Sequence, residues 1–256
     1  MLRPLPRFCT FVVLALLLHA APSAAQETIS SDRPGFGDGS ATMQPRAFQV
    51  EAGYSYSVAD DVTRHSIGEV LFRYGVTERF ELRAALNSYQ LQRGDAPDED
   101  GISDTDLGLK FNLVRGGDVP MGRPNLTLIA STSLPTGDDV FSSGVAQPTL
   151  TLAYDWPLGA GAGLSINGGY TFDTAESADD TVSLTASLGA PVPGAADLGV
   201  YVGYAGFYTD VLNTNYAEAG FTYLVTPRLQ LDLNGGIQLD GYSDEVFIGF
   251  GLAQRF

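Results

Sequence analysis

The sequence predicts an all-β protein, a twelve-stranded antiparallel transmembrane β-barrel that follows an N-terminal signal peptide. Three observations support this prediction. Apolar and polar residues alternate with a period of two through twelve separate stretches. The connections between these stretches alternate between longer, acidic segments and tight turns. The number of stretches is even, as in single-chain barrels of the bacterial outer membrane.

Residues 1–25 have the features of a secretory signal peptide. Arg3 and Arg7 give a positive start, and the apolar run Phe11–Leu18 that follows is too short to span a bilayer. Small residues come next, as a cleavage site requires. A buried N-terminal helix is the alternative interpretation. We expect the mature chain to begin near Gln26.

The composition of the mature chain limits its chemistry and its partners. Cleavage would remove Cys9, the one cysteine, so neither a disulfide nor thiol chemistry is expected. Without Arg3 and Arg7, 12 of the 14 basic residues remain against 30 acidic ones, a net charge of −18. A chain this acidic is not expected to bind nucleic acid through its phosphates. No later stretch approaches the about twenty apolar residues that a transmembrane helix needs.

Residues 26–45, the lead segment, show no alternation. Pro34, Pro45 and several glycines break any regular element there. Two interpretations stay open: a flexible tail on the periplasmic side, or a plug that folds into the barrel lumen, where Arg33 would meet carboxylates of the wall. The expected organisation is therefore a signal peptide over 1–25, the lead segment over 26–45 and the barrel over 46–256.

Twelve stretches are expected to form the barrel strands. Successive side chains of a strand point to opposite faces, so each stretch would turn an apolar face to lipid and a polar face to the lumen. With flanking residues most of them reach the ~9–11 residues of a tilted transmembrane strand. The expected strands are 49–56, 69–74, 80–87, 106–113, 126–131, 149–156, 164–172, 182–188, 200–205, 217–223, 229–239 and 246–253.

The connections suggest the orientation of the barrel. Tight turns such as "GVTE", "LGAGAG" and "VTPR" follow even-numbered strands, where two looser connections lie near 114–124 and 190–197. Long loops outside and short turns in the periplasm are the outer-membrane arrangement, and an even count places both termini in the periplasm. The longer connections, which follow odd-numbered strands, are 57–65, 92–103, 135–143 and 173–180.

A soluble β-sandwich or a lipocalin-like barrel would also alternate, with its apolar face inside. Two features argue against it. The polar set is dominated by Gly, Ser, Thr, Asn and scattered charges, which suit a wet lumen, and Tyr and Phe lie towards strand ends, as in an interfacial girdle. The alternation continues through "GFGLAQRF" to Phe256. The last strand is therefore expected to pair with the first, with the Phe256 ring towards lipid.

If the apolar set faces lipid, eight acidic and four basic residues line the lumen. Neighbours in the first strands, Glu69 with Arg73 and Glu81 with Arg83, bring both signs close together. These residues form either a structural network of paired charges that fills the lumen or a constriction that favours cations and neutral solutes over anions. The expected lumen residues are Glu51, Glu69, Arg73, Glu81, Arg83, Asp106, Lys110, Asp155, Glu218, Asp232, Glu245 and Arg255.

The sequence predicts no enzyme. After the signal peptide the chain has one histidine, His65, beside Ser66 at the end of the first external loop. Adjacent residues of a strand point to opposite faces, which is poor geometry for a Ser–His pair. We find neither a histidine cluster for zinc nor a glycine motif that cradles phosphate. No catalytic residue, metal site or cofactor is therefore expected.

Several short motifs resemble one family. The stretch "SDRPGFGDGS" followed by "QPRAFQVEAGYSYS", the turn "GVTERFELR", its echo "VTPRLQLD" and "SLPTGDD" resemble the MetA-pathway phenol-degradation family of outer-membrane transporters. The resemblance covers essentially the whole mature chain. It implies an outer-membrane barrel for the passage of small, often aromatic or hydrophobic, compounds. Phe256 also resembles the terminal aromatic residue that the barrel assembly machinery reads in bacterial outer-membrane proteins.

The expected function is a channel in the outer membrane of a Gram-negative bacterium, through which small-molecule solutes diffuse. Its expected surroundings are outer-membrane lipid and lipopolysaccharide, the latter bridged to the acidic loops by divalent cations in one interpretation. The alternative is a closed structural or adhesive barrel that acts through its acidic loops. A channel predicts solute flux, and a structural barrel predicts none.

Overall fold

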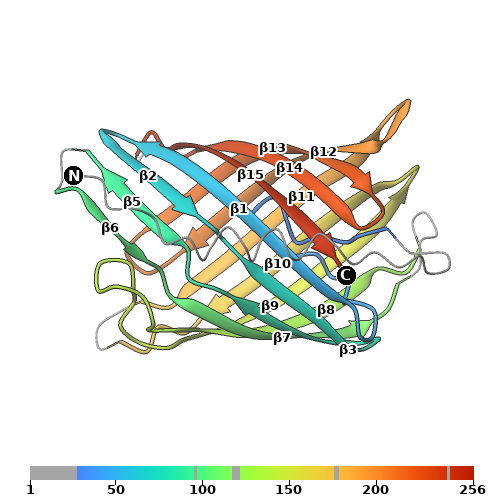
Figure 1. The fold of residues 1–256 in the computed structure, drawn as a ribbon, viewed down its shortest axis with the longest axis horizontal. Coiled ribbons are helices and arrows are strands. Elements are labelled where there is room, and N and C mark those ends of the chain that lie inside the picture. The colour runs from blue at the N-terminus through green and yellow to red at the C-terminus, as the bar shows by residue number, and fades with distance from the viewer. Residues whose placement is uncertain (1–27, 95–96, 117–121, 176–178, 241–242) are drawn as a thin grey trace, which may run out of the picture.

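The fold is a single antiparallel sheet that closes on itself (Figure 1). The computed structural model describes residues 28–94, 97–116, 122–175, 179–240 and 243–256. The expected signal peptide lies outside these residues. None of the described residues forms a helix that is long and apolar enough to span a membrane.

Fifteen strands follow one another along the described chain. In chain order they are β1 (Phe48–Ala59), β2 (Val62–Ile67), β3 (Leu71–Thr77), β4 (Phe80–Ala85), β5 (Tyr89–Arg93), β6 (Glu99–Ile102), β7 (Thr105–Val114), β8 (Asn125–Leu134), β9 (Gln147–Gly159), β10 (Ala162–Thr171), β11 (Thr181–Val192), β12 (Ala195–Tyr208), β13 (Asn213–Thr226), β14 (Leu229–Gln238) and β15 (Val246–Arg255).

These fifteen strands occupy twelve positions around the barrel. Three long strands are interrupted, so that β2 continues β3, β5 continues β4, and β6 continues β7. Both halves of each interrupted strand pair with the same neighbours: β1 pairs with β2 and with β3, and β5 pairs with β6 as β4 pairs with β7. Pairing of β15 with β1 closes the ring. The predicted twelve-stranded antiparallel barrel is therefore confirmed.

The first interruption is a β-bulge. Ile67 of β2 lies opposite Tyr54, whereas Leu71 of β3 lies opposite Glu51. Residues 68–70 thus lie opposite only residues 52 and 53 of β1. One extra residue on one strand of a pair defines a β-bulge. Gly68 takes a φ of 101° there, and its N–H still bonds to the Gly53 carbonyl oxygen at 3.0 Å. The positive φ explains why glycine occupies this position.

The expected loop over 57–65 is wrong. Strands β1 and β2 extend through it and leave a turn of two residues, Asp60 and Asp61, with a φ of 52° at Asp60. The connection expected over 190–197 is likewise a two-residue turn, at Pro193 and Gly194. At these strand ends the backbone pairing continues through residues that do not continue the apolar alternation, so the sequence underestimates strand length there.

The barrel is apolar outside and polar inside. The largest fully buried side chains include Arg73, Lys110, Glu51 and Glu81, groups that globular proteins keep at the surface. The outer surface carries a band of exposed apolar side chains instead, and such a band requires a lipid environment rather than water. The outward band of exposed apolar residues includes Leu107, Leu109, Phe111, Leu150, Leu152, Leu188, Val202, Phe221, Leu231, Leu233, Ile248 and Phe250.

Aromatic rings accompany the closing seam. The Tyr54 and Phe250 rings, on β1 and β15, lie with their centroids 5.1 Å apart. At the other end of the seam the Phe256 N–H bonds to the Phe48 carbonyl oxygen at 2.8 Å, and the two rings are 6.0 Å apart. Cross-strand aromatic pairs of this kind add to the stability of a strand pair.

The outward position of Leu233, at the centre of β14, gives a prediction. Leu233→Arg should lower the free energy of unfolding in lipid vesicles by about 2–4 kcal/mol, because it places a charge at the middle of the apolar band. Leu239→Arg, beyond the end of β14, should cost only about 0–1 kcal/mol. Denaturant unfolding of the two variants measures the difference. Equal losses would show that the outer band does not lie in the hydrocarbon region.

Candidate functional site

The lead segment lies inside the barrel. Its described residues, 28–45, contact side chains from strands all around the wall, which only an interior position allows. In Figure 1 this dark-blue stretch runs within the outline of the barrel, in the half nearer the C terminus. Its hydrogen-bonding and ionic partners include Gln49, Glu51, Glu69, Arg73, Glu81, Arg83, Lys110, Thr127, Asp155, Asn167, Glu218, Gln230 and Asp232.

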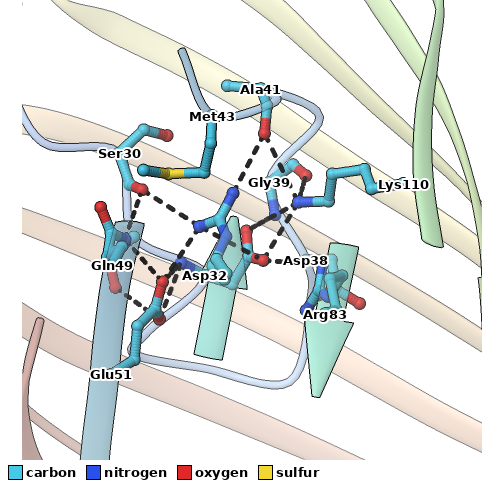
Figure 2. A network of polar contacts seen from close by, with 12 residues as sticks. Ser30, Asp32, Asp38, Gly39, Ala41, Met43, Gln49, Glu51, Arg83 and Lys110 are labelled. Carbon is cyan, nitrogen blue, oxygen red and sulfur yellow. Dashed lines mark hydrogen bonds and ion pairs between the residues drawn. The ribbon is translucent and has the colours of Figure 1, made fainter. Parts of the chain in front are cut away.

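Asp32 is the centre of these contacts (Figure 2). Its Oδ2 atom lies 2.8 Å from a guanidinium nitrogen of Arg83, 3.0 Å from Lys110 Nζ and 3.4 Å from Arg73 Nη1. Its Oδ1 atom accepts the N–H of Gly39 at 3.0 Å. One carboxylate from an irregular segment thus joins cations from three neighbouring wall strands, β3, β4 and β7. We call Asp32 and these three cations the Asp32 cluster.

Charge balance explains why the wall cations need Asp32. Arg73 is 1% exposed and Lys110 is fully buried, so both are removed from water. The wall itself supplies two buried carboxylates here, Glu51 and Glu81, which bind Arg73 at 3.0 and 2.8 Å. Three cations therefore face two wall carboxylates, and Asp32 supplies the third negative charge. A buried charge without a partner costs several kcal/mol, roughly 3–5 when a buried pair is broken.

The electrostatic environment keeps Asp32 ionised. Burial opposes its ionisation, but attraction to Arg73, Lys110 and Arg83 outweighs burial, so the pKa of the Asp32 carboxyl lies far below its ordinary value. A carboxyl with a lowered folded-state pKa stabilises the fold above its unfolded pKa, and the contribution is lost only as pH falls towards the folded value. Asp32 is thus ionised at neutral pH.

Glu51 fixes the backbone beside the Asp32 cluster. Its carboxylate accepts the Ser31 hydroxyl at 2.8 Å and the backbone N–H groups of Asp32 and Arg33 at 3.1 Å. The Ser30 carbonyl oxygen accepts hydrogen bonds from Gln49 and from Arg73. The irregular backbone of the lead segment therefore finds in wall side chains the partners that a regular element would supply internally.

Arg33 extends the network across the closing seam of the barrel to β14. Its two terminal nitrogens bind Glu69 at 3.1 Å and Asp232 at 3.3 Å. Gly53 and Gly251 line the space that its guanidinium occupies, and a Cβ atom at either position would collide with that group. These wall glycines leave the room in which the Arg33 side chain lies.

The second half of the lead segment is held through neutral and acidic side chains. The N–H and hydroxyl of Ser40 both donate to Asp155 at 2.6 Å, and Thr127 donates to the Ser40 carbonyl oxygen. Asn167 accepts the N–H of Asp38 and donates to its carbonyl oxygen. Asp38 also binds Arg83 at 2.7 Å. The segment is thus tied at both ends and at its middle.

Phe36 projects from the lead segment towards β12, β13 and β15. Its ring lies 5.2 to 5.8 Å from the rings of Tyr216, Phe247 and Phe207. Its N–H donates to Glu218 at 3.2 Å, and Glu218 also accepts the Tyr201 hydroxyl at 3.1 Å. Aromatic and carboxylate groups are therefore placed side by side at this point of the interior.

Three cavities flank the lead segment, and one of them, of about 540 Å³, lies beside its last residues, 41–45. We call the barrel end with the two-residue turns after β3, β9, β11 and β13 the turn end, and the opposite end the loop end. A cavity of about 800 Å³ opens beside the turn after β9 and is lined by Asp155, Trp156 and Tyr201. A cavity of about 280 Å³ lies towards the loop end and is lined by Phe36, Glu218 and other groups. Since Tyr201 lines one cavity and Glu218 the other, their hydrogen bond separates the two spaces.

The expected lumen residues divide into groups in the structure. Five of them surround or adjoin the Asp32 cluster, namely Glu51, Arg73, Glu81, Arg83 and Lys110. Glu69 and Asp232 bind Arg33, while Asp155 and Glu218 bind backbone groups of the lead segment. Glu245 accepts the Tyr216 hydroxyl at 2.9 Å. Asp106, which is partly exposed, and Arg255, which is buried in β15, lie outside these groups.

Glu69 and Arg73, and likewise Glu81 and Arg83, have other ion-pair partners in the structure. Arg73 binds Glu81 and Glu51, Glu69 binds Arg33, and Arg83 binds the two aspartates of the lead segment. The bulge at Gly68 separates Glu69 from Arg73, whereas cross-strand register brings Arg73 opposite Arg83 and beside Glu81. Neighbours across a sheet, rather than along the sequence, decide these contacts.

His65 and Ser66 do not lie in a loop but in β2, where they bind different groups. His65 Nδ1 is 2.8 Å from the Tyr54 hydroxyl, and Ser66 accepts a hydrogen bond from Gln90. Among the described residues, no group of three or more His, Cys, Asp or Glu side chains is placed to hold a metal ion.

Sequence reasoning singled out Arg33 in the lead segment but missed Asp32, Asp38 and Phe36. A signal for Asp32 exists in the sequence, because Arg73, Arg83 and Lys110 are inward-facing cations of consecutive barrel strands. Such a group needs an anion from somewhere other than the wall. The aromatic contacts of Phe36 have no comparable sequence signal.

The Asp32 cluster gives a prediction about stability. Asp32→Asn should lower the free energy of unfolding by about 3–5 kcal/mol, because it leaves buried cations without their partner. Asp38→Asn, on the same segment but with a side chain that is 31% exposed and a carboxylate that binds Arg83, should cost about 1 kcal/mol or less. Denaturant titration of both refolded variants measures the contrast. Similar losses would mean that burial of the Asp32 cluster does not decide how the segment is held.

Comparison with known proteins agrees with this architecture. The fold is similar to that of the COG4313 outer membrane channel from Pseudomonas putida F1, with a TM-score of 0.64 and 18% identity over 85% of this chain and 98% of that chain. It is also similar to the NanC porin, with a TM-score of 0.56 and 10% identity over 80% of this chain and 98% of that chain. For the KdgM porin the TM-score is 0.55 at 9% identity, over 80% and 99% of the two chains.

At these identities the likeness shows a shared fold alone. No curated protein sequence matches the chain. A family model, described as "Putative MetA-pathway of phenol degradation", matches residues 31–256. This match begins within the lead segment, one residue before Asp32, and continues through the whole barrel. The resemblance found in the sequence motifs is therefore confirmed, and the chain belongs to the MetA-pathway phenol-degradation family.

Proposed function

We propose that the protein is a channel in the outer membrane of a Gram-negative bacterium, through which small molecules, hydrophobic and aromatic ones included, diffuse without an energy source. The observation that carries this proposal is the pair of cavities inside a closed barrel, separated by the Tyr201–Glu218 hydrogen bond. A barrel with a purely structural role has no need of such spaces. The fold of outer-membrane channels and the family membership support the same function.

The lead segment acts in this proposal as a fixed constriction. The Asp32 cluster holds it against β3, β4 and β7, and none of these strands lines the two cavities of the proposed route. The wall of the larger one comes from β8 to β12, and that of the smaller one from β13, β14, β15 and β1. Solutes therefore pass between the seated segment and the opposite wall. The narrowest point lies where Gly35 and Phe36 approach Tyr201 and Glu218. All twelve expected lumen residues belong to this interior in the proposal, and their acidic excess favours cations and neutral solutes over anions.

We further propose that the outer band contacts lipid, and that the acidic loops at the loop end meet lipopolysaccharide. The barrel assembly machinery would read Phe256, by the resemblance of this residue to the terminal aromatic of outer-membrane proteins. Deleting Phe256 tests that part, since it should lower the amount of folded barrel in the outer membrane. An unchanged amount would exclude the recognition.

Single-channel recording in a planar bilayer tests the channel. The refolded chain should give steady current steps, and Tyr201→Ala should give larger ones, because it removes the ring that separates the two cavities. Tyr223→Ala is the matched control, since it removes a tyrosine from the outer surface of β13. A chain without residues 26–45 should also conduct more.

Each result has a clear meaning for the proposal. Equal steps from Tyr201→Ala and Tyr223→Ala would place the route elsewhere in the barrel. An unchanged conductance after removal of residues 26–45 would exclude the segment as a constriction. The absence of current from the refolded chain, from both variants and from the shortened chain would favour the closed structural or adhesive barrel.

A further inference from the structure

The loop-side cavity, the space of about 280 Å³ between Phe36 and the loop end, has an aromatic wall. Phe36, Tyr216 and Phe247 line it, and Phe207 packs against two of these rings. Phe36 contacts three aromatic rings and yet remains 39% exposed. Part of Phe36 therefore stays accessible to an occupant of the cavity.

The same cavity is negatively charged. Glu69, Glu218 and Glu245 line it, with Arg33 as the one cation among its lining residues. Arg33 already binds Glu69 and, outside the lining, Asp232. Its positive charge is thus neutralised within the wall, which leaves Glu218 and Glu245 to act on an occupant.

Neighbouring bonds fix both carboxylates in place. Glu218 is held by the N–H of Phe36 and the Tyr201 hydroxyl, and Glu245 is held by the Tyr216 hydroxyl. A further cation towards the loop end, Arg64, faces the same side of the sheet as Ser57 and bonds through its Nε to Gln92 at 3.2 Å. The carboxylates therefore lie in a rigid frame beside the aromatic faces.

Aromatic faces and fixed carboxylates together favour one class of occupant. An organic cation gains from the negative face of each ring and from the carboxylate charge, whereas an anion is repelled and a neutral solute gains neither. Space is sufficient, because a cavity of about 150 Å³ can hold benzene and this one is larger. The remaining volume accommodates an ammonium group.

We propose that the loop-side cavity is a binding site for small organic cations, in which an aromatic or short alkyl body carries a protonated or quaternary ammonium. The aromatic rings of Phe36, Tyr216 and Phe247 surround the cation, and Glu218 and Glu245 balance its charge. The site rests on the proposed function in one respect: a solute that enters from the loop end would occupy this cavity immediately before it reaches the constriction at the Tyr201–Glu218 hydrogen bond. It adds a substrate class to that function.

Isothermal titration with three probes that share a benzyl or phenyl ring tests the site. Benzyltrimethylammonium should bind the refolded barrel about 5–10 times more tightly than benzyl alcohol, and benzoate should bind least. Glu245→Gln and Phe247→Leu should each weaken binding of the cation about threefold or more. Asp244→Asn is the matched control, because it removes an exposed charge next to Glu245 without altering the cavity lining, and it should leave binding unchanged.

Folding of each variant is checked by far-UV circular dichroism before titration. Equal affinity for the cation and the alcohol, or the absence of any binding, would overturn the site. Equal weakening by Asp244→Asn and Glu245→Gln would also overturn it, since the effect would then come from the general field of the barrel mouth. Current recorded from the same preparation separates the two proposals: conduction together with equal binding of the cation and the alcohol contradicts the site alone, and tighter binding of the cation without conduction contradicts the channel alone.

Discussion

The burial of three cations inside the barrel is the constraint on which the rest of the interior depends. Arg73, Arg83 and Lys110 point inward from β3, β4 and β7, where the wall offers them two buried carboxylates. Desolvated charges of one sign are costly, so the wall requires an anion that it does not itself contain. Asp32 supplies it from a segment with no regular structure. One carboxylate thereby converts an otherwise flexible stretch of chain into a fixed part of the interior.

The position of the cavities follows from this attachment. Because the Asp32 cluster draws the lead segment to one side, space remains on the other, where glycines of β9 to β11 and the turn after β9 line the larger cavity. Phe36 and Gly35 then approach Tyr201 and Glu218 and divide the space in two. The outer surface plays no part in this arrangement. Its apolar band matches the lipid around the barrel, whereas the charges of the wall determine the arrangement of the interior.

Periodicity explains how much could be predicted. The alternation through 229–239 marks an outward and an inward face without ambiguity, and the same rule identified the other barrel strands and the twelve inward ionisable residues. The alternation could not predict which charged residues bind each other. Glu69 and Arg73 are close in sequence, yet a bulge at Gly68 and the register of β3 with β4 assign them other partners. The role of Asp32 was not evident because an irregular segment carries no period from which a position could be inferred. Tertiary contacts alone determine where it lies.

The central claim is that the lead segment stays attached to the wall while solutes pass beside it. Single-channel current from a disulfide-locked form tests this most directly. Gly37→Cys combined with Thr185→Cys suits the lock, because a Cβ atom at Gly37 would lie 2.7 Å from the Thr185 hydroxyl oxygen, close enough for a disulfide. The account predicts the same current from the oxidised and the reduced protein. Loss of current on oxidation, with recovery after reduction, would show that the segment must leave its place for solutes to pass.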